Sequence, residues 1–116
     1  MNNAELGKEG ERLAASYLEK NGYRVLASNW RFKRSEIDLI CQKGNLLVFV
    51  EVKTKSYVAF GQPEDSVDEK KAAKVIEGAE EYIFQNNWNQ DIRFDIISIV
   101  INGDQQKLLH LEDAFY

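Results

Sequence analysis

Hydrophobic residues at helical spacing open the chain. They form one stripe made of Leu6, Gly10, Leu13, Ala14, Tyr17 and Leu18. A repeat near 3.6 residues predicts an amphipathic helix over about residues 4–21. The Asn21-Gly22 pair that follows is typical of a helix C-terminus. Most carboxylates on such a helix are simply exposed, and this is the ordinary interpretation of Glu11. The alternative is that Gly7 and Gly10 permit a close approach and that Glu11 points over a neighbouring sheet.

A second helical stripe lies in the second half of the chain, formed by Ala72, Val75, Ile76, Ala79 and Ile83. Ser66 and Glu69 have the spacing of a capping box, so we predict that this helix begins near Ser66. Lys70, Lys71 and Lys74 lie in its early turns. A charge run of this kind is usually the solvated side of a helix, and the alternative is that one of the lysines faces phosphate.

Apolar runs between the helical stripes predict strands over residues 23–27, 36–42, 46–54 and 92–101, with an edge segment over residues 107–111. The run 92–101 is the most apolar, and we expect it to be central in the sheet. Residues 55–66 are predicted to be an ordinary connection. Tyr57, Phe60 and Gln62 within it would also suit a flap over a site.

The order of predicted elements is one helix, three strands, a second helix, a fourth strand and an edge segment. The strand–helix–strand step predicts a right-handed parallel crossover. The fold class is therefore α/β, with a mixed sheet of four to five strands flanked by helices (αβββαβ plus an edge strand). A chain of 116 residues has the size of one domain, and we expect residues 1–116 to form it.

One predicted hairpin contains charged residues within an otherwise apolar ribbon. Gly44-Asn45 separates two strand-like runs and indicates a two-residue turn. In that register Asp38 faces Glu51 across the two strands, and the side-chain alternation puts Asp38, Glu51 and Lys53 on one face. Two carboxylates about 5 Å apart repel one another unless something positive lies between them. They are well placed to share a divalent cation such as Mg²⁺.

A structural interpretation fits the same hairpin. Glu36 and Lys53 would face one another and could form a simple cross-strand ion pair. Asp38 could cap a bulge, and Glu51 could lie at a hydrated strand end. Spacing alone does not separate this interpretation from a metal site, since perturbed charges also occur in structural networks.

Composition changes this picture in two respects. A net charge of −4 argues against indiscriminate affinity for polyanions. Residues 20–35 nevertheless contain no acid and five basic residues, Lys20, Arg24, Arg31, Lys33 and Arg34, interleaved with Trp30 and Phe32. Basic and aromatic side chains together are typical of surfaces that hold phosphates and stack bases. The alternative is a solvated loop with Trp30 folded into the core.

Several classes of site and location are unattractive for this chain. The single Cys41 excludes an internal disulfide, and we expect it to be a small core residue in a reducing compartment. With His110 as the single histidine, Ser-His-Asp, Cys-His and zinc chemistry are poorly supported. No apolar run approaches a membrane span, and the first residues are polar, so we expect a cytoplasmic protein.

Six segments, spread over nearly the whole chain, carry a family resemblance. They are residues 7–14 (GKEGERLA), 29–31 (NWR), 36–40 (EIDLI), 48–54 (VFVEVKT), 61–63 (GQP) and 93–95 (RFD). With this order of elements, the chain resembles the restriction-endonuclease-like core of the PD-(D/E)XK nucleases. More closely, it is similar to the small bacterial YraN-like family (UPF0102), which has no settled activity. Ser35 departs from the pattern, which usually has glycine before EIDLI.

The resemblance implies a role for each matching residue. Asp38 and Glu51 would bind Mg²⁺ or Mn²⁺. Lys53 would orient or activate the attacking water, and Glu11 would assist from the first helix, as in archaeal Holliday-junction resolvases of the superfamily. The candidate nucleic-acid contacts are Arg31, Lys33, Arg34, Lys55 and Lys70.

The implied function is metal-dependent hydrolysis of DNA phosphodiester bonds, with branched and single-stranded DNA as candidate substrates and DNA favoured over RNA. The alternative is a non-catalytic module that binds nucleic acid or protein and retains the nuclease fold. Junction resolvases work as dimers, and a small domain offers a small footprint on DNA, so a homodimer is compatible with either function. No membrane partner is expected.

Overall fold

A computed structural model of the chain describes residues 1–56 and 67–115. Its elements are α1 (Asn3–Lys20), β1 (Arg24–Phe32), β2 (Ser35–Lys43), β3 (Leu46–Lys55), α2 (Glu69–Gln85), β4 (Asp91–Asn102) and β5 (Gln105–Leu111). This is the predicted order, and the expected α/β class, with a mixed sheet of five strands flanked by helices, is confirmed. No helix in the described part of the chain is both long and apolar enough to span a membrane.

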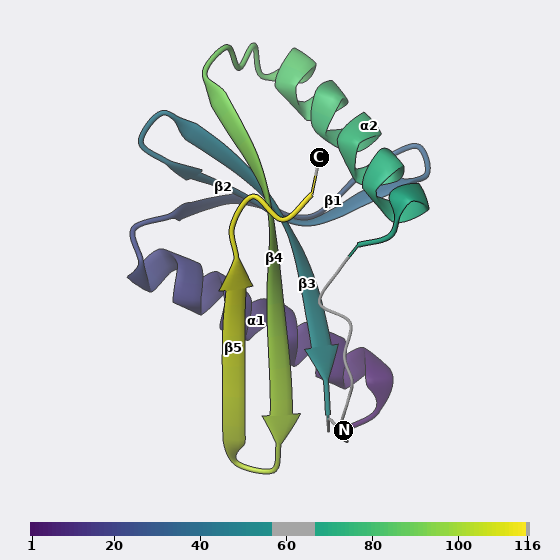
Figure 1. The fold of residues 1–116 in the computed structure, drawn as a ribbon, viewed down its shortest axis with the longest axis vertical. Helices are drawn as coiled ribbons and strands as arrows, with labels where there is room; N and C mark the ends of the chain where they lie inside the picture. Colours follow the sequence, from purple (N-terminus) through teal and green to yellow (C-terminus); the bar gives the residue numbers. More distant parts are fainter. Residues whose placement is uncertain (57–66, 116) are drawn as a thin grey trace.

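The strands form one five-stranded sheet in the order β1-β2-β3-β4-β5. All neighbours are antiparallel except β3 and β4, which are parallel, so the sheet is mixed as expected. β3 is the central strand, and the prediction that residues 92–101 would be central is wrong by one place. The reason is that β5 pairs with the outer side of β4. The sheet twists strongly, so that β1 and β2 cross the direction of β4 and β5 in Figure 1.

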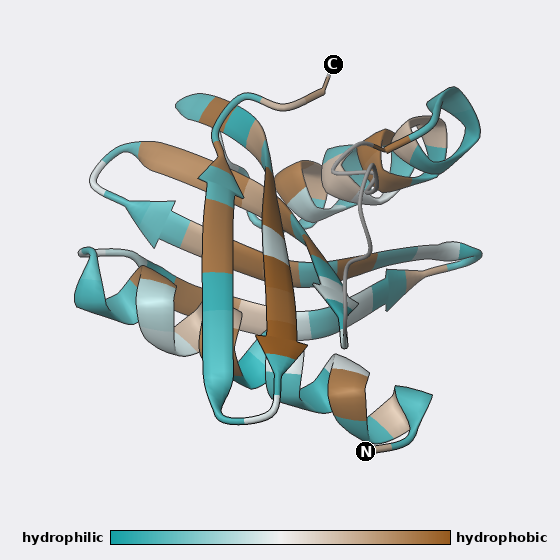
Figure 2. Ribbon diagram, turned by 60° about the horizontal axis from the view of Figure 1, so that its bottom comes forward, coloured by the Kyte–Doolittle hydropathy of each residue, from teal (hydrophilic) through white to brown (hydrophobic). Residues whose placement is uncertain are grey.

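The two helices cover opposite faces of the sheet. Successive β3 side chains point to opposite sides, so alternate residues of this strand pack against each helix. Val48 and Val50 belong to the core on the α1 side, whereas Leu47 and Phe49 belong to the core on the α2 side. Figure 2 shows the result as long hydrophobic stretches on the strands and mixed colours on the helices.

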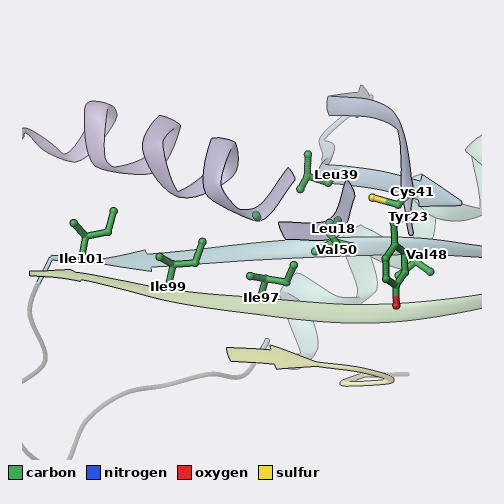
Figure 3. Close-up of a cluster of buried hydrophobic side chains, with 10 residues drawn as sticks. Leu18, Tyr23, Leu39, Cys41, Val48, Val50, Ile97, Ile99 and Ile101 are labelled. Carbon is green, nitrogen blue, oxygen red and sulfur yellow. The ribbon is translucent and has the colours of Figure 1, made fainter. Parts of the chain in front are cut away.

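The core beneath α1 is formed by the residues labelled in Figure 3. Cys41 is among them and is fully buried, as predicted. Burial raises the pKa of its thiol to about 12, so this cysteine is an inert packing residue and not a nucleophile.

α1 lies close to β3 at Gly10. A Cβ atom added to Gly10 would overlap the Thr54 side chain, whereas one added to Gly7 would meet nothing within 4 Å. The predicted close approach is therefore real at Gly10 and not at Gly7. This contact fixes the distance of α1 from the sheet, and therefore also the position of Glu11, which is the next residue of the helix.

Two element boundaries differ from the predictions. β1 extends to Phe32, well beyond the predicted end at Ala27, with an irregularity between Val25 and Ala27. Because β1 is an edge strand, it tolerates polar residues that looked like a loop in the sequence. α2 begins at Glu69 with Asp68 as its N-cap, not at Ser66.

Some predictions lie outside the described residues. These are Ser66, the flap candidates Tyr57, Phe60 and Gln62, and the segment 61–63. Ser35, by contrast, is described. It does not have the left-handed backbone that favours glycine, so the substitution of the usual glycine introduces no strain there. It is buried against α2, where a Cβ atom added to Gly78 would lie 3.0 Å from the Ser35 Cβ.

Candidate functional site

The β2–β3 ladder has the register that the Gly44-Asn45 turn predicts. Pairing runs from Lys43–Leu46 to Leu39–Val50 and ends there. Asp38 and Glu51 are the next residues on the two strands, so the predicted juxtaposition of the two acids is confirmed. The site is thus the open end of the hairpin ladder, where the strands are no longer joined by main-chain pairing.

Main-chain groups hold both acids at this open end. The Val52 N–H donates a 2.8 Å hydrogen bond to Oδ2 of Asp38. The Asp38 N–H in turn lies 3.5 Å from Oε2 of Glu51, a long hydrogen bond. Each acid is therefore tied to the strand that carries the other, and the two carboxylates lie side by side.

Burial dominates the electrostatics of the pair. Glu51 is only 3% exposed, and burial followed by the nearby Asp38 charge raises its pKa to about 7. The pKa of Asp38 is also raised, first by burial, while the Val52 N–H opposes the shift and the Glu11 charge adds to it. A positive charge placed between the two carboxylates would relieve their repulsion.

One positive charge is already present. Lys71 of α2 lies with its Nζ 3.3 Å from Oε1 of Glu51. Burial lowers the pKa of Lys71, but the Glu51 and Asp38 carboxylates raise it by more, so that it is raised overall. Lys70, the α2 lysine that the sequence named as a candidate nucleic-acid contact, is exposed; the lysine that contacts Glu51 is Lys71, which the sequence did not single out. The signal that identifies Lys71 is helix phase, because it lies one turn before the buried Val75.

Glu11 is close enough to influence Asp38 electrostatically, but its carboxylate has another partner. Asn29 of β1 donates a 3.1 Å hydrogen bond from Nδ2 to Oε1 of Glu11. Asn29 has a positive φ of 49°, a conformation that asparagine tolerates better than most residues. Within residues 1–56 and 67–115, no group of three or more His, Cys, Asp or Glu side chains is arranged to hold a metal. The role of Glu11 therefore stays a prediction.

Lys53 and Lys55 continue β3 beyond Glu51 at alternate positions, so strand geometry puts them on the same face as Glu51. Both are partly buried. Lys53 is therefore on the predicted face of the strand. Its part in the chemistry is untested by geometry alone.

The basic and aromatic segment forms the tip of the β1–β2 hairpin. Arg31 pairs with Glu36 at 3.2 Å, and Lys33 Nζ lies 5.1 Å from the centroid of the Phe32 ring. Phe32 stacks on Trp30, which packs in the core on the α2 side. The indole is thus partly a core residue, as the alternative interpretation held. Lys33 and Arg34 are exposed, and their turn lies beside α2 in Figure 1.

The donor set fits a divalent cation. Carboxylate oxygens are the ligands that Mg²⁺ and Mn²⁺ prefer. A carboxylate offers about four lone-pair directions, and the hydrogen bond from Val52 to Asp38 occupies one of them. Asp38 and Glu51 can therefore hold a cation between them without losing the main-chain bonds that position them.

A second polar network lies around Asp95. Arg93 and Asp95 form an ion pair, with two 2.8 Å bonds from the guanidinium to a fully buried carboxylate. His110 Nε2 lies 2.7 Å from Asp95, and its Nδ1 lies 2.9 Å from the Tyr17 hydroxyl. This chain fastens α1 to β4 and β5. His110 therefore has a structural role here, and the sequence likewise offered little support for a catalytic one.

Comparison with known proteins identifies a family. Residues 10–99 match the sequence model of the "Uncharacterised protein family UPF0102". The chain is 46% identical over 112 residues to a UPF0102 protein of Flavobacterium psychrophilum, covering 97% of this chain and 94% of the relative. It is 42% identical over 119 residues to one of Caldanaerobacter subterraneus, covering 99% and 98%.

Among solved structures, the chain is similar to Pyrococcus furiosus SfsA in complex with Ca²⁺. The TM-score is 0.42 and the identity 13%, over 97% of this chain and 64% of the other. At that level of similarity the site must be judged on its own residues.

Proposed function

The chain belongs to the uncharacterised protein family UPF0102, and we propose that it is a divalent-metal-dependent nuclease that hydrolyses DNA phosphodiester bonds. One observation carries the proposal. Asp38 and the buried Glu51 lie side by side at the open end of the β2–β3 ladder. Each carboxylate accepts a hydrogen bond from a main-chain N–H of the other strand. Two carboxylates in a largely dry position, with raised pKa values, form a site that favours a cation.

Each residue has a part in the proposed reaction. Asp38 and Glu51 hold the cation. Bound there, Mg²⁺ or Mn²⁺ would stabilise negative charge developing on the phosphate and lower the pKa of the attacking water. Lys53, two positions after Glu51, orients that water and offsets transition-state charge. Glu11, held by Asn29, supplies a further acceptor from α1.

A basic surface beside the site supports DNA as the substrate. Lys33 and Arg34 project from the hairpin tip, and Lys70 is exposed on the first turn of α2. Together with the exposed Arg31, they would neutralise backbone phosphates; the Nζ of Lys55, the remaining predicted contact, is buried. Since the net charge of the chain is −4, this attraction is local, and the binding should weaken steeply with salt. A homodimer would double the small footprint of one domain.

The experiment is a cleavage assay with linear, flapped and four-way DNA and with matched RNA, in Mg²⁺, Mn²⁺ or EDTA. We expect metal-dependent DNA cleavage by the wild type, with Asp38→Asn and Glu51→Gln inactive. These isosteric variants retain shape and remove charge, so folding can be verified independently by circular dichroism. Wild-type cleavage no greater than that of the two variants would reject the proposal.

The second candidate function is a module that binds nucleic acid or protein without chemistry. The observation that favours it is the Lys71–Glu51 ion pair, which already neutralises the buried acid. Salt-dependent DNA binding that is unchanged in Asp38→Asn, with no Mn²⁺ binding by calorimetry, would support the nucleic-acid-binding form. The absence of any DNA affinity would leave protein interaction.

A further inference from the structure

Lys71 and Glu51 form an ion pair with very unequal exposure. Their side chains are 52% and 4% exposed, respectively. The carboxylate thus lies in the protein interior, while much of the lysine side chain reaches solvent. A buried carboxylate needs a partner, because leaving it charged and alone is strongly unfavourable. In the described structure Lys71 is an ionic partner of this carboxylate.

The helix holds Lys71 in place through its own backbone. The Lys71 N–H donates a 2.8 Å hydrogen bond to Oδ1 of Asp68, the N-cap of α2. Farther along, Val75 is buried and Gly78 packs against Ser35. The start of α2 is therefore fixed over the sheet. The backbone of Lys71 is thus held at a defined point above the sheet, and its long side chain is the part that can move.

The ammonium and a divalent cation would need the same carboxylate. Lys71 contacts Oε1 of Glu51, and a cation shared by Asp38 and Glu51 would lie within a few ångströms of that atom. Two positive charges at such a distance repel one another strongly where water is largely excluded. A cation bound at Glu51 therefore weakens its ion pair with Lys71, and the half-exposed lysine side chain can turn toward solvent.

Building on the proposed function, we infer that Lys71 is a tethered counter-ion that neutralises Glu51 when no metal is bound and is displaced when a divalent cation binds. It keeps the site intact in the metal-free protein. It also lowers the affinity of the site for a cation, because the cation must bind Glu51 more strongly than the Lys71 ammonium does. Lys71 is therefore a positioning residue for the site and not one of its ligands.

The test uses the full-length chain and two variants with opposite expected effects. Lys71→Gln removes the competing charge, so Mn²⁺ affinity measured by calorimetry should rise by roughly threefold or more. Lys71→Arg keeps the charge and adds the planar fork that binds carboxylates in two places, so Mn²⁺ affinity should fall. Lys74→Gln is the matched control. It removes the same charge from an exposed position one turn further along α2, and its affinity should stay within about twofold of wild type.

A second readout does not involve metal. In EDTA at pH 8, Lys71→Gln should unfold at lower denaturant concentration than the wild type, because Glu51 has lost its partner, and Lys74→Gln should not. If Lys71→Gln does not fold, the opposite shift expected for Lys71→Arg still tests the inference.

The outcomes separate this inference from the proposed nuclease. Equal Mn²⁺ affinity for the wild type, Lys71→Gln and Lys71→Arg overturns the counter-ion role, even if the wild type cleaves DNA. The predicted opposite shifts without any DNA cleavage would overturn the nuclease and uphold the counter-ion. Failure of every protein to bind Mn²⁺ would overturn both.

Discussion

The main chain of β3 holds the acid of β2: the Val52 N–H donates a 2.8 Å hydrogen bond to the Asp38 carboxylate. At this point the regular ladder has ended, and a side chain takes the place of the main-chain carbonyl that would normally accept the bond. Asp38 therefore has a structural task that is separate from any task in binding a cation.

Two substitutions at Asp38 should separate these tasks. Asp38→Asn keeps an oxygen for the Val52 N–H, whereas Asp38→Ala leaves that donor without its partner. We expect Asp38→Ala to lower the free energy of unfolding by about 1 to 2 kcal/mol more than Asp38→Asn does. Chemical denaturation in EDTA measures the difference. Equal stabilities would show that water replaces the lost acceptor.

Stability should depend on the pH through Glu51. Its pKa is raised on folding from an ordinary 4.5 to about 7, so the folded state binds the proton more tightly than the unfolded state. The resulting stability is complete below about pH 4.5 and is lost as the pH rises through about 7, a change on the order of 2 to 3 kcal/mol. Denaturation curves between pH 4.5 and 8.5 in EDTA measure it.

Glu51→Gln is the control for this pH dependence. It cannot ionise, so relative to the wild type it should gain stability as the pH rises, and the two proteins should converge near pH 5. A gap between them that stays constant with pH would contradict the raised pKa. Adding Mn²⁺ at pH 8 should stabilise the wild type and leave Glu51→Gln nearly unchanged, because a cation that binds the folded state alone raises its stability.

The Asp95 network should be the most sensitive polar part of the fold. Asp95 is fully buried and accepts hydrogen bonds from Arg93 and from the Asp113 N–H, with His110 at 2.7 Å. Asp95→Asn leaves the guanidinium without its charged partner and should destabilise the protein by about 3 kcal/mol. The exposed Asp104→Asn, in the turn before β5, should change the stability by no more than about 0.5 kcal/mol. Similar losses for both variants would contradict this account.

Two glycines of α1 should respond in opposite directions to alanine. Gly7→Ala adds a Cβ into open space and should stabilise the helix by about 0.5 to 1 kcal/mol. Gly10→Ala would drive a Cβ into Thr54 and should instead cost about 1 to 3 kcal/mol, as overpacking does. Thermal unfolding of the two variants tests the pair. A stabilising Gly10→Ala would mean that α1 can lift away from β3 without penalty.

Local sequence signals predicted the centre of the site well. The Gly44-Asn45 turn fixes the register of β2 and β3, and that register brings Asp38 to Glu51. Strand alternation then puts Cys41 on the other face of the sheet from Asp38, in the core on the α1 side. These relationships depend on a turn of two residues and on the period of a strand, and both can be read from a single sequence.

Relationships between distant elements were harder to predict. The choice of Lys71 over Lys70 depends on how α2 rotates above the sheet, which the packing of Gly78 on Ser35 helps to set. The bond from His110 to Asp95 depends on the pairing of β5 with β4. The start of α2 was misplaced because Ser66 and Asp68 are both good caps, and the structure uses Asp68.

We expect the two-residue turn to set the order in which the site assembles during folding. The hairpin closes through local contacts, which form early because little chain entropy is lost, whereas Lys71 arrives on a helix that follows in the chain. We therefore expect Asp38 and Glu51 to meet before Lys71 reaches them. If this encounter is part of the rate-limiting step, refolding in EDTA should be faster at pH 5 than at pH 8, and Glu51→Gln should remove the difference in stopped-flow measurements. A rate that does not change with pH would place closure of this end of the hairpin after the barrier.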